Sequence, residues 1–536
     1  MLHGRRKLSL IGLNVLCIAV ILFLCFLRGM ADHADRNIDQ STYTTLPPDE
    51  SPEDPLLYLS PEFQVAEGFH SNMPIVILEV DGEMPDYKRF ESSREYLTGE
   101  EPYTTGTVSI IDGGGYDNHI TDSPSVVSSL RIKKRGHTSY VFDKEQYLLR
   151  LTGQDGEANA VDVMGMGAHD SWILNGSMAD KSMLRNYLSY RISSEVSPIT
   201  PDSRFCEVIF KKDGTYIYQG LYLMMETVAR DKNRVDIDEF KKKNIYTSYI
   251  VRRDRFTHFD LMLDTYGRLN GLSEEWIGLK YPSERKLTAK ARRFIEEDFS
   301  RIEQVLYSED EGVFRTYGRY IDTDTFVDYF LLNEYFGNYD AGMHSTYMYK
   351  NSGEKLKIGP VWDFDQAMNN YFQDEMDPDT MAFQERPFFR QLAQDRYFVE
   401  LLQKRYAKLR RDTLSDRHVK DVMDEAAAYI RSARVREWYR WAADYYEGDH
   451  LNYRNYYLED YVLDGTVVSR FNDRYDQEIY TIRVYLEKHG KAIATQLKNL
   501  EKMCVWDTSY RSENKLMLLL IMVLFLVPSV LIIRKG

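Results

Sequence analysis

Short hydrophobic runs in the first half of the chain predict β-strands. These runs are rich in Val, Ile, Leu and Tyr, and they are separated by Gly, Asp and Asn, which favour turns. One helical pattern interrupts them, at about residues 181–194. The strands are expected at residues 74–80, 107–111, 129–133, 147–151, 207–210 and 219–224.

After about Leu287 the pattern changes, and apolar residues recur at three- and four-residue spacing, which is typical of amphipathic helices. A strand-rich segment followed by a helical one predicts an α+β fold. We expect a β-rich N-terminal lobe at residues 62–286 and a helical C-terminal lobe at residues 287–505. The helices are expected at residues 289–308, 323–336, 388–413, 416–434 and 471–503.

Two long apolar runs lie near the ends of the chain, at residues 8–27 and 516–533. At about 1.5 Å rise per residue, each run is long enough to cross a bilayer core of roughly 30 Å. The first run exceeds the roughly 7–15 apolar residues of a cleaved signal peptide, which favours a membrane anchor. The sequence therefore predicts two transmembrane helices.

Basic residues orient these helices. They precede the first run and follow the second, so both tails, residues 1–7 and 534–536, are expected in the cytoplasm. Residues 28–61 are polar, acidic and punctuated by prolines, which predicts an extracellular linker. The predicted location is a bacterial cell membrane, with the folded region outside the cell.

Charge and cysteine content exclude two classes of function. The net charge of −15 argues against nucleic acid as a partner, because phosphate backbones need a basic surface. Only Cys206 and Cys504 lie outside the first apolar run, which is too few for a disulfide framework or a thiolate zinc site. An exported domain that avoids cysteine is consistent with a bacterial source.

Three aspartates are candidates for chemistry. Asp363 and Asp365 are two residues apart, so they point the same way from an extended backbone and can bind hard cations through oxygen. Asp340 precedes them and can act as a base. Such a set suits phosphoryl transfer, although aspartates in loops are also common as turn and cap residues.

Several short motifs extend this pattern along the chain. They are Lys134–Ser139, Tyr147–Leu151, Asp180–Asn186, Gly214–Glu226, Phe326–Asp340 and Gly359–Asp365. Their order resembles that of the CotH kinase family, named for spore coat protein H, over roughly residues 73–499. The resemblance implies an atypical protein-kinase-like bilobal fold and transfer of phosphate from ATP, with Mg²⁺ or Mn²⁺, to serine or threonine of an exported or cell-surface protein.

The resemblance also implies roles for individual residues. Asp340 matches the catalytic aspartate, Asp363 the metal-binding one, and Asp365 is a candidate second ligand. Ordinary kinases place an asparagine five residues after the catalytic aspartate, whereas this chain has Ser345, which leaves the number of metals open.

Candidates for contacts with the nucleotide are less specific. Lys144 is the first choice for the phosphates, followed by Arg135 and Arg150. Arg185 can reach the same pocket or form a salt bridge, and Glu226 can line the pocket near a hinge or stabilise the connection.

Other functions remain open at the sequence level, because ATP is scarce outside a bacterial cell. The domain can use another phosphate donor, transfer a nucleotidyl unit, or bind partners without catalysis. The 40 tyrosines also allow a glycan-binding module in contact with the cell wall, although they are spread along the whole chain.

Overall fold

The computed structural model describes residues 42–508 apart from internal gaps. These gaps are residues 52–53, 85–102, 115–116, 137–141, 177, 256–259, 273–275, 371–375, 448–460, 464–465 and 469–474. The two runs expected to span a membrane, residues 8–27 and 516–533, lie outside the described residues. Within the described part, no helix combines the length and the apolar character needed to cross a bilayer.

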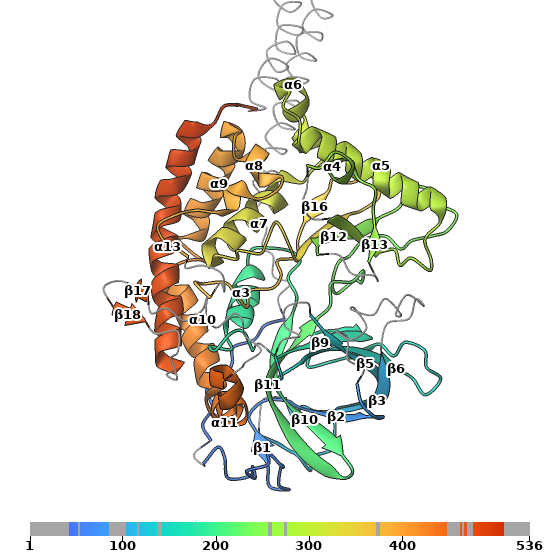
Figure 1. Ribbon diagram of the computed structural model, residues 1–536, viewed down its shortest axis with the longest axis vertical. Coiled ribbons are helices and arrows are strands. Elements are labelled where there is room, and N and C mark those ends of the chain that lie inside the picture. Colours follow the sequence, from blue (N-terminus) through green and yellow to red (C-terminus); the bar gives the residue numbers. More distant parts are fainter. Residues whose placement is uncertain are drawn as a thin grey trace, which may run out of the picture.

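Seven strands from the first half close into a barrel (Figure 1). Around the barrel they are β10 (Ser203–Lys212), β11 (Thr215–Glu226), β9 (Ser171–Asn175), β6 (Gln146–Thr152), β5 (Val126–Arg135), β3 (Thr104–Ile111) and β2 (Ile75–Val80). Neighbours pair antiparallel except β2 and β10, which pair parallel and close the barrel. Apolar side chains such as Val76, Leu149 and Trp172 fill its interior. The interior is therefore a packed core, and the outer face is available for a site.

A second sheet stands beside the barrel. Its order is β13 (Leu261–Met262), β14 (Trp276–Tyr281), β12 (Tyr249–Asp254), β15 (Thr346–Lys350) and β16 (Lys357–Ile358). The segment from β12 to β14, which sequence analysis grouped with the first half, thus pairs with strands of the second half. Such pairing joins residues about a hundred positions apart, which no local pattern records.

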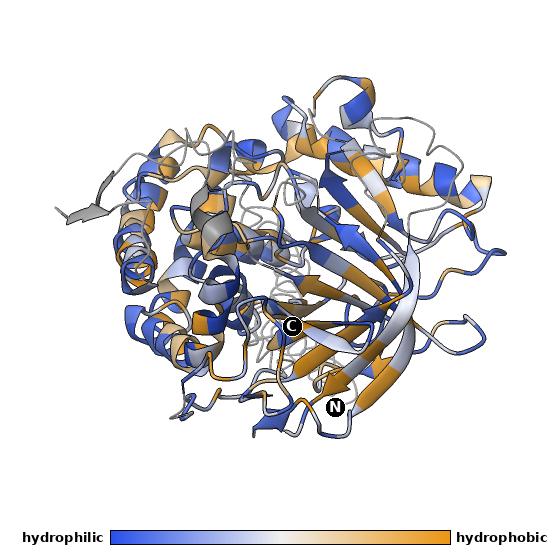
Figure 2. Ribbon diagram, turned by 60° about the horizontal axis from the view of Figure 1, so that its bottom comes forward, coloured by the Kyte–Doolittle hydropathy of each residue, from blue (hydrophilic) through white to orange (hydrophobic). Residues whose placement is uncertain are grey.

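Helices pack around this second sheet and beside the barrel. The longer ones are α3 (Arg185–Ser193), α5 (Ala289–Leu306), α7 (Thr323–Phe336), α9 (Arg396–Leu409), α10 (Asp416–Tyr429), α11 (Arg431–Glu447) and α13 (Tyr475–Met503). The short ones are α4 (Tyr266–Leu269), α6 (Glu311–Phe314) and α8 (Phe389–Leu392), with 3₁₀ turns at Tyr317–Arg319 and Phe383–Glu385. Figure 2 shows apolar and polar residues mixed along the helices, whereas the strands carry long apolar stretches. The mixture of strands and helices confirms the predicted α+β class.

Helix boundaries follow local capping chemistry. Asp322 accepts a hydrogen bond from Thr325 N at the start of α7, and Gly337 ends that helix in the left-handed conformation, with φ 61°. The helix expected over residues 388–413 is divided into α8 and α9, because Asp395 caps α9 by accepting from Tyr397 N.

Three small two-stranded pairs complete the described secondary structure. They are β1 (His70–Ser71) with β4 (Asn118–His119), β7 (Val161–Asp162) with β8 (Ala168–His169), and β17 (Tyr461–Leu463) with β18 (Thr466–Val468).

The segment from Thr42 to Ser51 is packed against the fold, although it falls within the expected linker. Leu46 N donates to Glu425 Oε1 of α10 at 2.7 Å, and buried Asp49 accepts from Ser432 N of α11 at 2.8 Å. Tyr43 Oη lies 2.8 Å from Ser203 Oγ of β10, so this segment connects α10 and α11 with the barrel.

Helix α11 docks on the barrel strands through buried ion pairs. Arg436 lies 2.6 Å from Glu207 of β10, and Glu437 lies 2.7 Å from Lys144, just before β6. Gly220 makes this approach feasible, because a Cβ at that position would lie 2.2 Å from Glu437 Oε2. These two ion pairs fix α11, and with it the helical half of the chain, against the barrel.

Candidate active site

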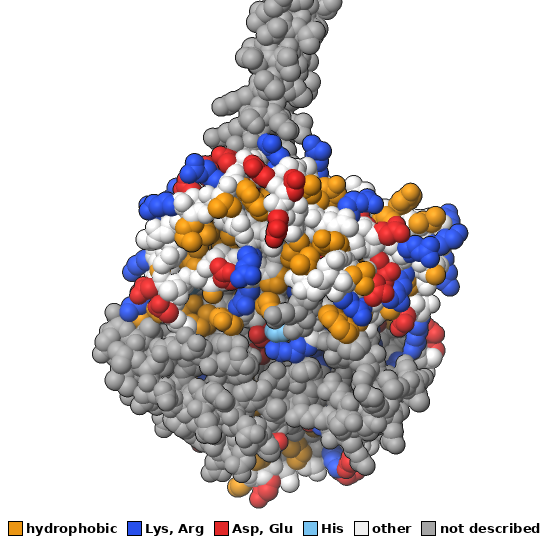
Figure 3. All heavy atoms as spheres, turned by 45° about the horizontal axis from the view of Figure 1, so that its top comes forward, with side chains coloured by type: hydrophobic (Ala, Val, Ile, Leu, Met, Phe, Trp, Pro, Cys, Tyr) orange, Lys and Arg blue, Asp and Glu red, His pale blue; other side chains and the backbone are white. Residues whose placement is uncertain are grey.

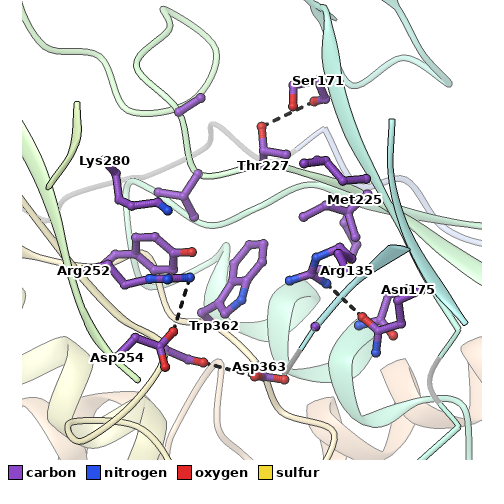
Figure 4. Close-up of a pocket in the computed structure, with 18 of the residues that line it drawn as sticks. Arg135, Ser171, Asn175, Met225, Thr227, Arg252, Asp254, Lys280, Trp362 and Asp363 are labelled. Carbon is purple, nitrogen blue, oxygen red and sulfur yellow. Dashed lines mark hydrogen bonds and ion pairs between the residues drawn. The ribbon is translucent and has the colours of Figure 1, made fainter. Parts of the chain in front are cut away.

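A cavity of about 790 Å³ lies between the outer face of the barrel and the second sheet. Strands β5, β6, β9 and β11 form its roof, β12 and β14 form one wall, and the loops after α7 and β16 form its floor. In Figure 4, Lys280 and Arg252 enter from one side and Arg135 from the other, with Asp363 below them. The cavity has the volume of a small-molecule site.

Asp363 lies on the floor in a constrained conformation. Its φ of 64° is in the left-handed region, its N–H donates to Tyr190 Oη at 3.1 Å, and its Oδ2 accepts from Ser345 Oγ at 3.1 Å. Burial and the nearby charge of Asp340 raise the pKa of Asp363 to about 6. The carboxylate is held in place by its neighbours and is costly to ionise.

Asp365 and Asp340 complete the floor. The Asn186 side chain of α3 donates to Asp365 Oδ1, and Asn186 Oδ1 accepts from Phe364 N at 2.8 Å. Burial raises the pKa of both Asp365 and Asp340, and the charge of Asp363 adds to the shift at Asp365. The structure thus brings the three predicted aspartates to one floor. The extended backbone expected between Asp363 and Asp365 was wrong, because Asp363 is left-handed.

Asp254, which was not predicted from the sequence, is a further carboxylate of the cavity. It ends β12 on the side wall, and its Oδ2 lies 3.3 Å from Arg252 Nη1. Its negative charge contributes to the raised pKa of Asp340 and of Asp363. No motif around it marks it in the sequence, because it reaches the site only through the pairing of β12 with β15.

On the roof, side chains that point out of the barrel form rows across neighbouring strands. Strand pairing aligns Lys133, Leu148, Ile173 and Met225 in one row across four strands. The neighbouring row begins with Arg135 opposite Gln146, and Arg135 Nη1 donates to Gln146 Oε1 at 2.8 Å. The roof therefore offers an apolar strip bordered by polar groups and cations.

Arg135 is the predicted cation that the structure brings to the carboxylates. Its positive charge opposes the rise in the pKa of both Asp363 and Asp365.

Lys144 also lines the cavity, but its side chain is fully buried. Its Nζ donates to Leu221 O at 2.6 Å and to Glu437 Oε1 at 2.7 Å, and it lies 4.6 Å from the centroid of the Tyr222 ring. Burial lowers the pKa of Lys144, while Glu437 opposes that shift. The ammonium group is thus held between α11 and the backbone of β11, with no exposed surface.

The remaining predicted residues lie apart from the floor. Arg150 lines the cavity but is exposed. Arg185 does not line the cavity; it is buried between Asp180, at 2.5 Å, and Glu478, at 2.8 Å. Glu226 is buried 3.4 Å from Arg234, and burial raises its pKa to about 8. Arg185 and Glu226 therefore stabilise the surroundings of the cavity.

The carboxylate oxygens on the floor can bind a metal ion whose remaining coordination positions are filled by a bound ligand. Among the described residues, no group of three or more His, Cys, Asp or Glu side chains is arranged to hold a metal ion alone. Mg²⁺ commonly takes one or two carboxylates and completes its shell with phosphate oxygens and water. Asp363 and Asp365, the predicted ligands, fit that mode, because a cation would relieve their mutual repulsion.

Comparison with known proteins places this site in a family. The family model described as CotH kinase protein matches residues 132–491, which include both the roof strands β6, β9 and β11 and the carboxylate floor. No curated protein matches the chain. The matched region is well over half of the chain, and the protein therefore belongs to the CotH kinase family, which suggests a kinase-like function.

Proposed function

We propose that the protein is an ATP-dependent protein kinase that phosphorylates serine or threonine of an exported or cell-surface protein. The barrel half and the helical half would be the two lobes of an atypical kinase fold. The observation that carries this proposal is that a floor of aspartates lies in the same cavity as Lys144, which forms a buried ion pair with Glu437 of α11. Protein kinases combine a strand lysine paired with a helix glutamate and aspartates that serve the metal and the acceptor.

The roof offers a place for the base of the nucleotide. Leu148, Ile173 and Met225 are directly aligned on three neighbouring strands and present an apolar strip to the cavity. A planar base bound below this strip would direct its phosphates toward Arg135 and the carboxylates. Arg135 supplies positive charge at the point where the phosphates would meet the floor.

Asp363 and Asp365 would hold Mg²⁺ or Mn²⁺, which, when bound, neutralises charge on the phosphate oxygens. Ser345 donates to Asp363 Oδ2 and Asn186 donates to Asp365, so each carboxylate keeps a defined orientation before any ligand arrives. This preorganisation supports phosphoryl transfer, in which positioning and electrostatics supply most of the rate enhancement.

Asp340 would orient the acceptor hydroxyl and take its proton. The hydroxyl oxygen forms a bond to the γ-phosphorus while the bond from that phosphorus to the β,γ-bridging oxygen breaks, which leaves ADP. Burial raises the pKa of Asp340, so its carboxylate is a better proton acceptor than one in water.

The proposed location rests on the sequence. Two apolar runs, residues 8–27 and 516–533, would anchor the protein, and the basic residues outside them would keep both tails in the cytoplasm. The kinase would then act on proteins outside the membrane.

The test is transfer of label by the detergent-solubilised full-length chain, with Mg²⁺ or Mn²⁺ and ATP labelled at the α- or γ-phosphate. We expect transfer from the γ position only, with a loss of about 100-fold or more in Asp340→Asn and Asp363→Asn. Asp421→Asn, an exposed change on α10, is the matched control. Transfer of α-label would indicate nucleotidyl transfer. If the protein showed no transfer of label and no metal-dependent stabilisation by ATP, the proposal would be contradicted.

A further inference from the structure

The mouth of the cavity is more basic than the chain as a whole. Of the charged side chains that line the cavity, the exposed ones mark its mouth. Among the described residues these are the cations Arg150, Lys280 and Arg285 and the single carboxylate Glu284. The full chain has a net charge of −15, and Figure 3 shows acidic and basic side chains interspersed on the face drawn there. An excess of cations at the mouth is therefore a local feature.

On the barrel side, two arginines lie directly opposite each other. Arg131 of β5 pairs with Arg150 of β6, and both side chains are exposed. Like charges at opposed strand positions destabilise a sheet. Both arginines contact Tyr103. The Arg131 guanidinium lies 4.5 Å from the centroid of the Tyr103 ring, and Arg150 Nε donates to the Tyr103 hydroxyl at 3.2 Å. This arrangement keeps the positive charge of Arg131 next to Arg150, which lines the cavity, although Arg131 itself is outside the lining.

On the opposite side, the cations follow the end of β14. Lys280 lies on that strand, 3.4 Å from Asp260. Arg285, which lines the cavity beside Glu284, and Lys286, which lies next to the lining, follow it, and both are exposed. Figure 4 shows Lys280 entering the cavity from the side opposite Arg135. Positive charge thus flanks the mouth on both walls.

We propose that the mouth selects an acidic acceptor: a polypeptide segment in which aspartate or glutamate side chains flank the hydroxyl to be phosphorylated. The inference rests on the proposed function and names the substrate class. Arg135, Asp363 and Asp365 are less exposed than the residues of the mouth and would serve the phosphate donor, whereas the cations of the mouth would border the path by which an acceptor reaches Asp340. Clefts lined by one sign of charge attract ligands of the opposite sign.

The test uses the full-length chain and three serine peptides of equal length, flanked by Asp and Glu, by Asn and Gln, or by Lys and Arg. At low salt we expect the KM of the acidic peptide to be about 10-fold below that of the neutral peptide. A few partly exposed ion pairs contribute enough binding free energy for a difference of this size. The advantage should shrink as salt is added. Arg285→Glu/Lys286→Glu should raise the KM of the acidic peptide about 10-fold and change the KM of ATP much less.

The control carries the same change of net charge elsewhere. Lys491→Glu/Lys498→Glu alters two exposed residues of α13 outside the cavity lining. Equal effects of the two double variants, or a preference for neutral or basic peptides, would overturn the inference. A rise in the KM of ATP alone would also overturn it, because the mouth would then serve the donor.

Binding without chemistry separates the two proposals. Fluorescence anisotropy of each labelled peptide, measured without ATP, reports charge selection alone. Salt-sensitive binding of the acidic peptide without phosphate transfer to any peptide would contradict the kinase proposal and support an acidic partner. Transfer without any dependence on peptide charge would support the kinase and contradict the acidic acceptor.

Discussion

The ionised form of Asp363 lowers the stability of the folded protein, for the same reasons that suit the residue to the proposed metal site. It has a left-handed backbone, and its buried carboxyl group shares the floor with Asp340. Its pKa of about 6 in the folded protein exceeds the ordinary value of 3.8, so folding favours the protonated form. The stability linked to this proton is fully present below about pH 4 and is lost as the pH rises through about 6.

The first prediction concerns Asp363→Asn. Asparagine tolerates the left-handed conformation and carries no charge to bury. At pH 7.5, without metal, we expect the thermal midpoint of the variant to exceed that of the wild type by about 2–4 °C, and at pH 4 the two should agree. Differential scanning calorimetry at both pH values measures this. A variant less stable than the wild type at pH 7.5 would contradict the argument.

At the scale of elements, α11 acts as a clamp on the barrel. Its Glu437 accepts from Lys144 Nζ and from Leu221 N, at 2.7 and 2.8 Å, with no exposure of either charged side chain. Each buried charge is stabilised by the other, because the desolvation free energy of an unpaired buried ion is not offset by any opposite charge.

The second prediction is that Glu437→Ala destabilises the protein by about 3–5 kcal/mol, since it leaves the Lys144 ammonium buried without a counter-charge. The double variant Lys144→Met/Glu437→Leu should recover only part of that loss, because it removes the buried charge but leaves Leu221 N and Leu221 O without these side-chain partners. Urea unfolding followed by tryptophan fluorescence compares the three proteins. Equal midpoints for the single variant and the wild type would argue against the clamp.

The third prediction concerns the segment from Thr42 to Ser51. Asp49 is buried and accepts from Ser432 N in the first turn of α11, where a negative charge also favours the helix dipole. We expect Asp49→Ala to cost about 1–3 kcal/mol. Asp54→Ala, at an exposed position nearby, should cost little. Thermal unfolding of both variants distinguishes a structural segment from a passive linker.

At the scale of the whole molecule, the family match and the folding unit have different boundaries. The match begins at residue 132, inside β5, whereas the barrel also contains β2 and β3. Without these two strands, β5 and β10 would expose unpaired edges, and the barrel core would lose Val76 and Val108.

The fourth prediction is that residues 132–491, expressed alone, do not fold, whereas residues 42–508 do. The longer segment also keeps the contact of Trp506 O with Arg396 N, at 2.9 Å, after α13. Near-ultraviolet circular dichroism and cooperative thermal unfolding are the measurements. A soluble, cooperatively folding 132–491 segment would show that the barrel does not need β2 and β3.

The sequence by itself determined the local features of the protein. The apolar spacing predicted α7 at residues 323–336 as the structure has it, and the start of α10 at Asp416. The order of motifs also identified the family. These features depend on neighbours within a few positions along the chain, which a single sequence records.

Only the tertiary structure decided which distant residues meet. It brings Arg135 to the carboxylates and ties Lys144 to Glu437, nearly three hundred residues away. It adds Asp254 through the pairing of β12 with β15, and it keeps Arg185 and Glu226 out of the cavity. Strand order, helix docking and burial arise from contacts between segments far apart in the chain, and periodicity along one segment carries no information about its partner.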